Sequence, residues 1–231
     1  MKEKESGTLQ TLDRGLSTIE LVAQSSEGLT VAAIAKALGV HRAIAYRIVS
    51  TLETHAMVTR SPDGRVLLGI GIPAIAGQFM PQFRVLAEAP LRKLASDAAA
   101  TAFIAVAEGD DCVAMQVEEP PGHLIRVGYR VGSRHALSQG AAGLAILAAR
   151  PPQRDDPESV RQARADGYSL TQGQLQRGAV GVAVALGRTD NRAGSPEFSI
   201  GVVAMEDLDI ERAIRCVKET VRCLDGLMRR A

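Results

Sequence analysis

The sequence predicts two domains: an amino-terminal winged helix-turn-helix and a carboxy-terminal α+β domain built on an antiparallel sheet. Three observations lead to this fold class. Two short amphipathic helices follow one another within residues 30–52, and a Pro-Asp-Gly turn separates two short apolar runs within 57–69. After residue 101, strand-like apolar runs alternate with turns. A chain of 231 residues is long enough for two such domains.

The amino-terminal domain begins with an expected helix from about Thr11 to Gln24. A second helix stops at Gly39 and a third follows almost at once, because apolar residues recur at helical spacing on both sides of that glycine. These positions are Val31, Ile34, Ala35 and Leu38 before the glycine, and Ile44, Ile48, Val49 and Leu52 after it. Two helices joined by a short Gly-containing turn are typical of proteins that place the second helix in the DNA major groove.

Polar side chains gather at the start of the third helix, where such motifs contact base edges and phosphates. A hairpin, the wing, is predicted at Pro62-Asp63-Gly64, because proline presets φ and glycine supplies a positive φ. The candidate DNA-binding residues are His41, Arg42, Tyr46 and Arg47 on the helix, and Arg60 and Arg65 beside the wing turn. The alternative is a small helical domain that binds protein.

Residues 70–83 carry no charged side chain, which is unexpected for a surface linker. We therefore expect a helical connector at 70–85 that is buried, either against a second copy of the chain or within one subunit. The expected domains are a winged helix-turn-helix at 1–69, this connector, and an effector-binding and oligomerisation domain at 86–231.

The carboxy-terminal domain is expected to begin with a helix at 85–99. Two apolar runs, 102–107 and 112–117, flank Gly109-Asp110-Asp111 and predict a hairpin. The remaining expected elements are strands at 124–129, 179–186 and 198–205, a helix at 140–149 and a closing amphipathic helix at 209–228. Helices at both ends of an antiparallel sheet make an α+β domain.

Composition limits the location and the partners. No apolar run approaches the roughly 18 residues of a membrane span, and the first residues lead to no secretory signal. Cys216 and Cys223 are too far apart along one helix to form a disulfide, so reduced thiols and a cytoplasmic location are expected. The net charge of +1 is not the strongly basic balance of many DNA-binding proteins, and it favours a dimer that doubles the DNA contacts.

Motifs for catalysis are missing from the sequence, so neither an enzyme nor a cofactor is expected. The chain has no Gly-x-Ser-x-Gly elbow and no Walker A loop, and its four histidines lack metal-ligand spacing. Gly69-Ile70-Gly71 imitates a dinucleotide fingerprint, but Pro73 interrupts it and no βαβ unit follows. Its expected role is to end the wing and to start the connector.

Nearly the whole chain resembles the IclR-type transcriptional regulators. The amino-terminal segments that carry the resemblance are 12–16, the Leu-Gly-Val turn at 38–40, 46–53 and 62–69. The carboxy-terminal ones are 126–134, 138–148 and Gly167-Tyr168. The resemblance implies a GAF-like or PAS-like effector domain and a homodimer or tetramer that binds double-stranded operator DNA. It also implies a repressor whose DNA binding a small-molecule effector modulates through the connector.

The same resemblance implies a set of effector-binding residues. They are Ala141, Ala142, Gly143, Thr171, Gly181, Gly201 and Val203. Small residues at a helix start let a carboxylate approach free N–H groups, although they serve close helix-on-sheet packing equally well. Because few of these positions are polar, we expect a carboxylate with an apolar or aromatic body.

This sequence departs from the family pattern in two places. Ala43 and Ile44 replace the family's common Ser-Thr pair, so base reading is expected to depend on the other residues at the start of that helix. The shortened segment 150–166 leaves a member without an effector as an alternative. The competing function is a ligand-sensing module that acts through protein contacts, with a degenerate DNA-binding domain.

Overall fold

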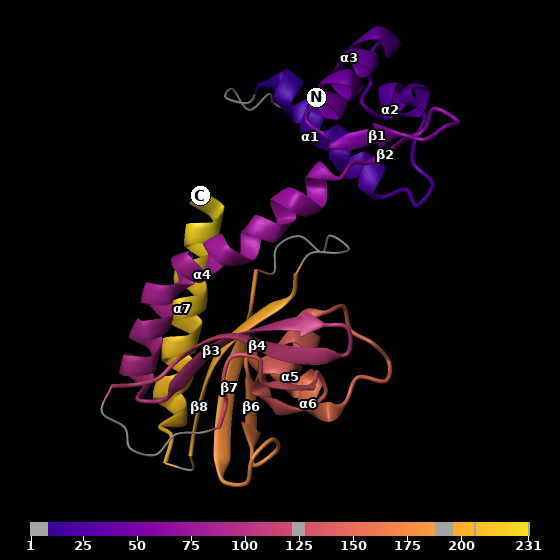
Figure 1. The fold of residues 1–231 in the computed structure, drawn as a ribbon. Coiled ribbons are helices and arrows are strands. Elements are labelled where there is room, and N and C mark those ends of the chain that lie inside the picture. The colour runs from indigo at the N-terminus through magenta and orange to yellow at the C-terminus, as the bar shows by residue number, and fades with distance from the viewer. Residues whose placement is uncertain (1–8, 122–127, 188–195, 206, 231) are drawn as a thin grey trace, which may run out of the picture. The chain divides into compact units, whose positions relative to one another are not determined.

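The computed structural model describes residues 9–121, 128–187, 196–205 and 207–230 (Figure 1). The chain divides into two units, residues 1–82 and 83–231. The first unit contains α1 (Gln10–Ala23), α2 (Val31–Ala37), α3 (Arg42–Thr54), β1 (Val58–Arg60), β2 (Val66–Leu68) and the beginning of α4 (Gly71–Ala98). This order confirms the winged helix-turn-helix that the sequence predicts.

Local signals set the bounds of the two central helices. The hydroxyl of Thr30 accepts a hydrogen bond from the backbone N–H of Ala33 (3.2 Å) and so caps the start of α2. Gly39 has a φ of +62°, which lets the chain turn between α2 and α3. Ile44, which we expected on the apolar face of α3, is 40% exposed, and Ala45 is buried instead. The spacing of Ala45, Ile48 and Val49 defines the true buried face.

The wing is fixed to the rest of its unit by backbone hydrogen bonds. Strands β1 and β2 pair antiparallel, with Val58 opposite Leu68. Val66 pairs on its other side with Leu29, with N–O distances of 3.0 and 2.8 Å. Val58 and Val66 are buried in the same cluster as the apolar residues of the three helices. The hairpin therefore shares the hydrophobic core of the three helices and is hydrogen-bonded to the segment before α2.

The second unit is built on a six-stranded antiparallel sheet of order β5-β4-β3-β8-β7-β6. Its strands are β3 (Thr101–Glu108), β4 (Asp111–Glu118), β5 (Arg134–Ala136), β6 (Ser169–Gln172), β7 (Ala179–Leu186) and β8 (Phe198–Met205). Its helices are the remainder of α4, α5 (Gly140–Ala149), α6 (Glu158–Asp166) and α7 (Ile210–Arg230). The α+β architecture that the sequence predicts is confirmed.

Helices cover both faces of this sheet (Figure 1). On one face, α5 packs against Phe103, Ala105 and Ala183, which point to the same side of β3 and β7. On the other face lie α7 and the second half of α4, where the rings of Phe83 and Phe198 stack with centroids 5.2 Å apart. A sheet buried on both faces explains why its strands read as nearly continuous apolar runs.

The structure differs from the expected elements in three ways. The connector and the helix expected at 85–99 form one continuous helix, α4. The short strands β5 and β6 and the helix α6 were not expected, because three or four residues carry little periodicity and α6 follows a Pro-rich segment. Most of the strand expected at 124–129 lies outside the described residues.

Close packing brings α5 onto the sheet. A Cβ atom built at Gly143 would lie 2.3 Å from the carbonyl oxygen of Leu137, so only glycine fits there. The hydroxyl of Ser169 lies 2.6 Å from the carbonyl oxygen of Ala141 and ties β6 to the first turn of the helix. Helix α6 covers the outer side of α5 through Val160 and Ala163. Small residues thus set the position of the helix above the strands.

We predict that Gly143→Ala lowers the free energy of unfolding of the carboxy-terminal unit by about 1–3 kcal/mol, because its methyl group meets backbone that cannot rotate away. The matched control is Gly226→Ala in α7, where a Cβ meets nothing within 4 Å and helix propensity improves by roughly 1 kcal/mol. Urea unfolding followed by circular dichroism measures both. Equal stability of the two variants would contradict the packing role of Gly143.

Candidate functional sites

The outer face of α3 carries most of the predicted DNA-binding residues. His41 caps the helix, its Nδ1 accepting a 3.4 Å hydrogen bond from the N–H of Ala43. Arg42, Tyr46 and Arg47 follow on the exposed side. Neither the Arg42 nor the Arg47 guanidinium forms an ion pair or a hydrogen bond with the described residues. The helix therefore presents two uncompensated positive charges to solvent.

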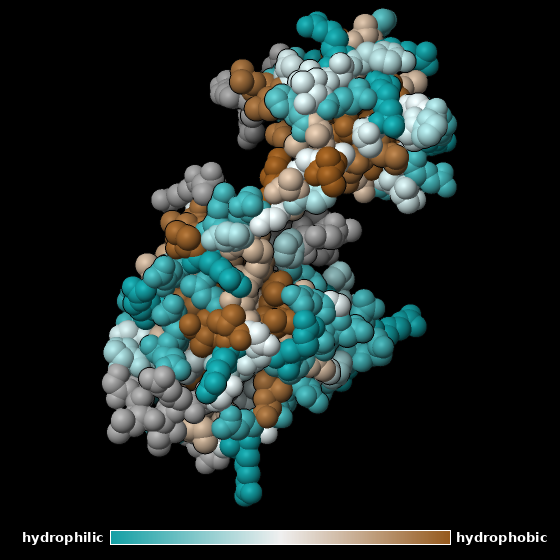
Figure 2. Space-filling model, in the orientation of Figure 1, coloured by the Kyte–Doolittle hydropathy of each residue, from teal (hydrophilic) through white to brown (hydrophobic). Residues whose placement is uncertain are grey.

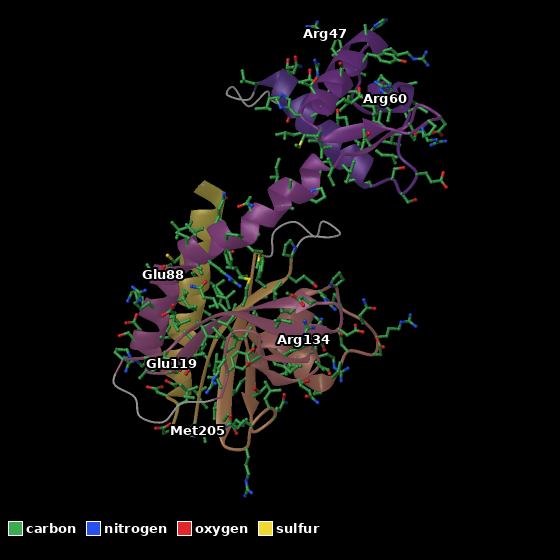
Figure 3. All side chains as sticks on the ribbon, viewed as in Figure 1. Arg47, Arg60, Glu88, Glu119, Arg134 and Met205 are labelled. Carbon is green, nitrogen blue, oxygen red and sulfur yellow. The ribbon has the colours of Figure 1, made fainter. Side chains whose placement is uncertain are left out.

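The wing contributes a third arginine to the same region. The Nε atom of Arg60 lies 2.9 Å from Oε1 of Glu53 on α3, and its guanidinium carbon lies 5.8 Å from the centroid of the Tyr46 ring. Arg47 on α3 and Arg60 on β1 both belong to this unit (Figure 3). The salt bridge and the cation–π contact orient Arg60 and partly neutralise its charge.

Arg65 has a different local role. Its Nε donates to a carboxylate oxygen of Asp63 (3.1 Å), and one of its terminal nitrogens donates to the carbonyl oxygen of Gly28 (3.3 Å). The Ser61 hydroxyl also donates to Asp63, which holds the pKa of that carboxyl below its ordinary value. Arg65 thus braces the wing turn, and Arg42 and Arg47 remain the unpaired cations of the predicted set.

Ile44 lies on the exposed face of α3, although its spacing in the sequence predicted a buried position. It is exposed between Arg42 and Arg47 on α3. A branched apolar side chain at the start of a recognition helix is suited to contact the methyl group of thymine. Ile44 is exposed because the face of α3 that packs on the core contains Ala45 in its place. The sequence pattern does not identify Ala45 as buried, because alanine gives a weak apolar signal.

In the second unit, a small cavity that is open to solvent lies between the start of α5, the sheet and the loop that joins β6 to β7. The cavity is lined by Phe103, Tyr129, His135, Ala141, Ala142, Thr171, Gln174, Leu175, Ala179, Gly181 and Val203.

Five of the seven predicted effector residues line this cavity: Ala141, Ala142, Thr171, Gly181 and Val203. Two do not: Gly143 packs on the backbone of Leu137, and Gly201 lies against the carbonyl oxygen of Val182 and the ring of Phe103. At both positions, only glycine lets the backbone approach the neighbouring atoms this closely. These two glycines therefore serve close packing, the alternative role that the sequence allowed for the small residues of this region.

Three polar lining residues escaped the sequence argument: Tyr129, His135 and Gln174. His135 lies on the short strand β5 and Gln174 in the β6–β7 loop, elements that periodicity does not detect. Tyr129 lies within the segment 126–134 that carries the family resemblance and His135 directly follows it, and this resemblance is the one signal in the sequence that points to them. With Thr171 they bring four polar side chains to the cavity, whose exposed lining is still mainly apolar, as we expected.

Tyr129 and His135 form a hydrogen-bonded pair. The His135 Nδ1 lies 3.1 Å from the carbonyl oxygen of Ala136, which only accepts, so Nδ1 carries the proton. In the neutral ring, Nε2 then accepts from the Tyr129 hydroxyl at 3.3 Å. Burial raises the pKa of Tyr129, so its phenol stays protonated. The phenolic oxygen keeps its lone pairs for a donor on a ligand.

The start of α5 offers backbone donors to the same cavity. Gln139 precedes the helix and makes no side-chain cap. The first N–H, that of Gly140, donates to Oε1 of Gln174 at 2.9 Å. Ala141 and Ala142, which follow it, line the cavity. The N–H groups at the start of a helix can donate hydrogen bonds to an oxygen of a ligand, and here Gln174 of the protein itself supplies that oxygen.

Within the described ranges, no cluster of three or more histidine, cysteine or acidic residues is arranged to hold a metal ion. No described helix combines the length and the apolar character needed to cross a membrane. Cys112, Cys216 and Cys223 are all free thiols, and burial raises the pKa of Cys112 to about 12, which leaves it protonated and unreactive.

Comparison with known proteins identifies the first unit. Residues 11–62 match the IclR helix-turn-helix domain. The chain is 28% identical over 152 residues to the HTH-type transcriptional regulator TtgV of Pseudomonas putida, which covers 64% of this chain and 58% of the relative. It is 25% identical over 146 residues to the transcriptional repressor IclR of Escherichia coli, covering 62% and 53%. The similarity thus spans little more than half the length of these curated relatives.

Solved structures share the fold of the entire chain. A putative IclR-family regulator from Rhodococcus sp. superimposes with a TM-score of 0.66 at 18% identity, over 98% of this chain and 97% of that one. An IclR homologue from Microbacterium hydrocarbonoxydans, solved in complex with 4-hydroxybenzoate, gives a TM-score of 0.56 at 18% identity, over 96% and 100%.

The domain match, the curated relatives and the shared two-domain architecture agree with one another. Residues 11–62 are an IclR helix-turn-helix domain, and the chain has the two-domain fold of solved IclR-family regulators.

Proposed function

We propose that this protein is a transcription regulator, acting as a repressor, that binds operator DNA through α3 and the wing. The observation that carries the proposal is the pair of unpaired guanidinium groups, Arg42 and Arg47, on the exposed face of the second helix of a helix-turn-helix. Two cations with no internal partner are suited to phosphates or to guanine edges. The names of the curated relatives, a transcriptional regulator and a repressor, support the same function.

We also propose that it binds DNA as a homodimer or a tetramer. The first unit exposes a row of leucines on and just before α1, Leu9, Leu12 and Leu16, of which Leu12 is 60% exposed. Ile75, on the uncharged first part of α4, is 63% exposed. Apolar residues exposed among polar ones on this unit are visible in Figure 2. A second copy that covers them would remove apolar surface from water and double the DNA contacts.

The cavity of the second unit is proposed to bind the effector, a small carboxylate with an aromatic body. Phe103 and Val203 provide apolar walls, and the start of α5 provides N–H groups for a carboxylate. The Tyr129 oxygen accepts a hydrogen bond from a hydroxyl on the ligand. The homologue that was crystallised with 4-hydroxybenzoate binds a ligand of this chemical class.

Effector binding is proposed to reach the DNA-binding unit through α4. This helix starts in the first unit and continues as a layer of the second, where Ala87, Leu91 and Leu94 are buried. Because α4 directly follows the wing strand β2 in the chain, a change in the second unit that moves α4 also moves the end of the wing. A coupling of about 1–3 kcal/mol between the two sites would change operator occupancy several-fold.

For DNA binding, we expect Arg42→Ala to weaken affinity for specific operator DNA by about 1–3 kcal/mol, because one bidentate contact to a guanine is lost. Arg154→Ala, which removes an exposed positive charge from the other unit, is the matched control and should bind as the wild type. Fluorescence anisotropy with labelled DNA from upstream of the protein's own gene, at two salt concentrations and with random DNA as competitor, measures both.

Different outcomes of this experiment separate the possible roles of Arg42. An equal loss on random DNA would show a phosphate contact in place of base reading. If the wild type binds promoter DNA no better than random DNA, and genome-wide selection finds no site, the protein acts instead as a ligand sensor through protein contacts.

For the effector, we expect benzoate and 4-hydroxybenzoate to raise the midpoint of thermal unfolding, and pyruvate and glyoxylate to leave it unchanged. At a ligand concentration 100 times Kd, the stabilisation is about 2.7 kcal/mol. Benzamide is the matched control, because it has the same body without the charge that α5 favours. Stabilisation by the small keto acids alone would overturn the proposed ligand class.

A further inference from the structure

We propose that Gln174 is a built-in plug of the effector cavity, which a ligand carboxylate must displace; this rests on the cavity being the effector site. The side-chain oxygen of Gln174 accepts the hydrogen bond of the Gly140 N–H at 2.9 Å. It thus occupies the position that one oxygen of a carboxylate would take at the start of α5. The side chain comes from the loop of residues 173–178, between β6 and β7.

Contacts around Gly140 hold this loop against the helix. Gly140 has a φ of +72°, and a Cβ there would lie 2.6 Å from Cδ1 of Leu175. Only glycine therefore lets Leu175 cover the first turn of α5 while Gln174 reaches its N–H group. Both loop residues line the cavity, so the loop that closes the site also forms part of its wall.

The loop is free to open without disturbing the sheet. The Gly173 N–H donates to the carbonyl oxygen of Ala179 at 2.8 Å, which closes the base of the loop. Residues 174–177 beyond that bond are exposed, and Leu175 is 46% exposed even when it is closed. Within the loop, the Ala179 N–H also donates to the carbonyl oxygen of Gln176 at 3.0 Å. Turning the Gln174 side chain away therefore breaks one hydrogen bond of an amide group, and this backbone bond can remain.

A second group marks the cavity as a ligand site independently of the helix start. Thr171 is 8% exposed and lines the cavity, and its hydroxyl forms no hydrogen bond with the described part of the chain. The residue is buried but its oxygen is not among the buried polar atoms that lack a partner, so the hydroxyl is open to a hydrogen bond from a ligand in the cavity. The Thr171 oxygen lies 3.3 Å from a Cβ built on Gly181, so a substitution of this glycine would crowd the same spot.

Charge decides the competition between plug and ligand. A carboxylate forms charge-assisted hydrogen bonds, about twice as strong as those of a neutral amide, and it interacts favourably with the positive end of the helix. A neutral ligand has no such advantage over Gln174. The plug therefore acts as a filter that selects anionic ligands, and its release changes the conformation of the loop when the effector binds.

The test compares Gln174→Ala, Gln174→Glu and the control Gln176→Ala, which truncates a neighbouring glutamine of the same loop. Without ligand, hydrogen exchange of the Gly140 amide and tryptic cleavage after Arg177 should both be faster in Gln174→Ala than in the wild type. In Gln174→Glu both should be slower, and Gln176→Ala should match the wild type.

Binding of 4-hydroxybenzoate, measured by calorimetry, provides the second arm. Gln174→Ala should bind about two- to tenfold more tightly, the factor expected from one removed hydrogen bond, and Gln174→Glu should bind at least several-fold more weakly. In the wild type, the ligand should accelerate cleavage after Arg177 while it raises the thermal midpoint. A residue that simply contacts the ligand would give the opposite signs.

Weaker binding by Gln174→Ala, or cleavage after Arg177 that the ligand slows, would overturn the plug. Binding of 4-hydroxybenzoate by neither the wild type nor Gln174→Ala would overturn the carboxylate site together with the plug. Failure to bind operator DNA would overturn the proposed function alone, because neither arm of this test uses DNA.

Discussion

Close packing of α5 on the sheet is the constraint on which the effector cavity depends. Gly143 brings the first turn of the helix against the backbone of Leu137, and the hydroxyl of Ser169 fixes the carbonyl group of Ala141 above β6. A helix of larger residues would stand farther from the strands and fill the cavity with its own side chains. The small residues therefore have both of the roles that the sequence allowed. Gly143 serves close packing, and Ala141 and Ala142 line the space that this packing leaves.

The sequence predicted the elements whose signals are long or chemically specific. Helical spacing around Gly39 and the Pro62-Asp63-Gly64 turn identified the winged helix-turn-helix, and the apolar runs of β7 and β8 gave those strands with their observed bounds. Short elements with weak signals were missed, notably β5, α6 and β6. Periodicity also misplaced Ile44, because a helix face is decided by what lies beneath it, and alanine at position 45 was enough to fill the core.

The candidate cavity was predicted in outline, and its polar chemistry was not. Thr171, Gly181 and Val203 were placed correctly beside the start of α5. Tyr129, His135 and Gln174 reach the cavity from β5 and from loops, where side-chain direction depends on the fold of the whole unit. The Tyr129–His135 pair and the hydrogen bond from Gly140 to Gln174 are contacts between segments, so they become visible only in three dimensions.

In the proposed function, ligand binding to this cavity controls DNA binding by the other unit. The most direct test measures the affinity for operator DNA with and without saturating 4-hydroxybenzoate, and the affinity for 4-hydroxybenzoate with and without that DNA. The account predicts a change of about fivefold or more, equal in both directions because the coupling is reciprocal. Operator affinity that is unchanged while the ligand is bound would contradict it.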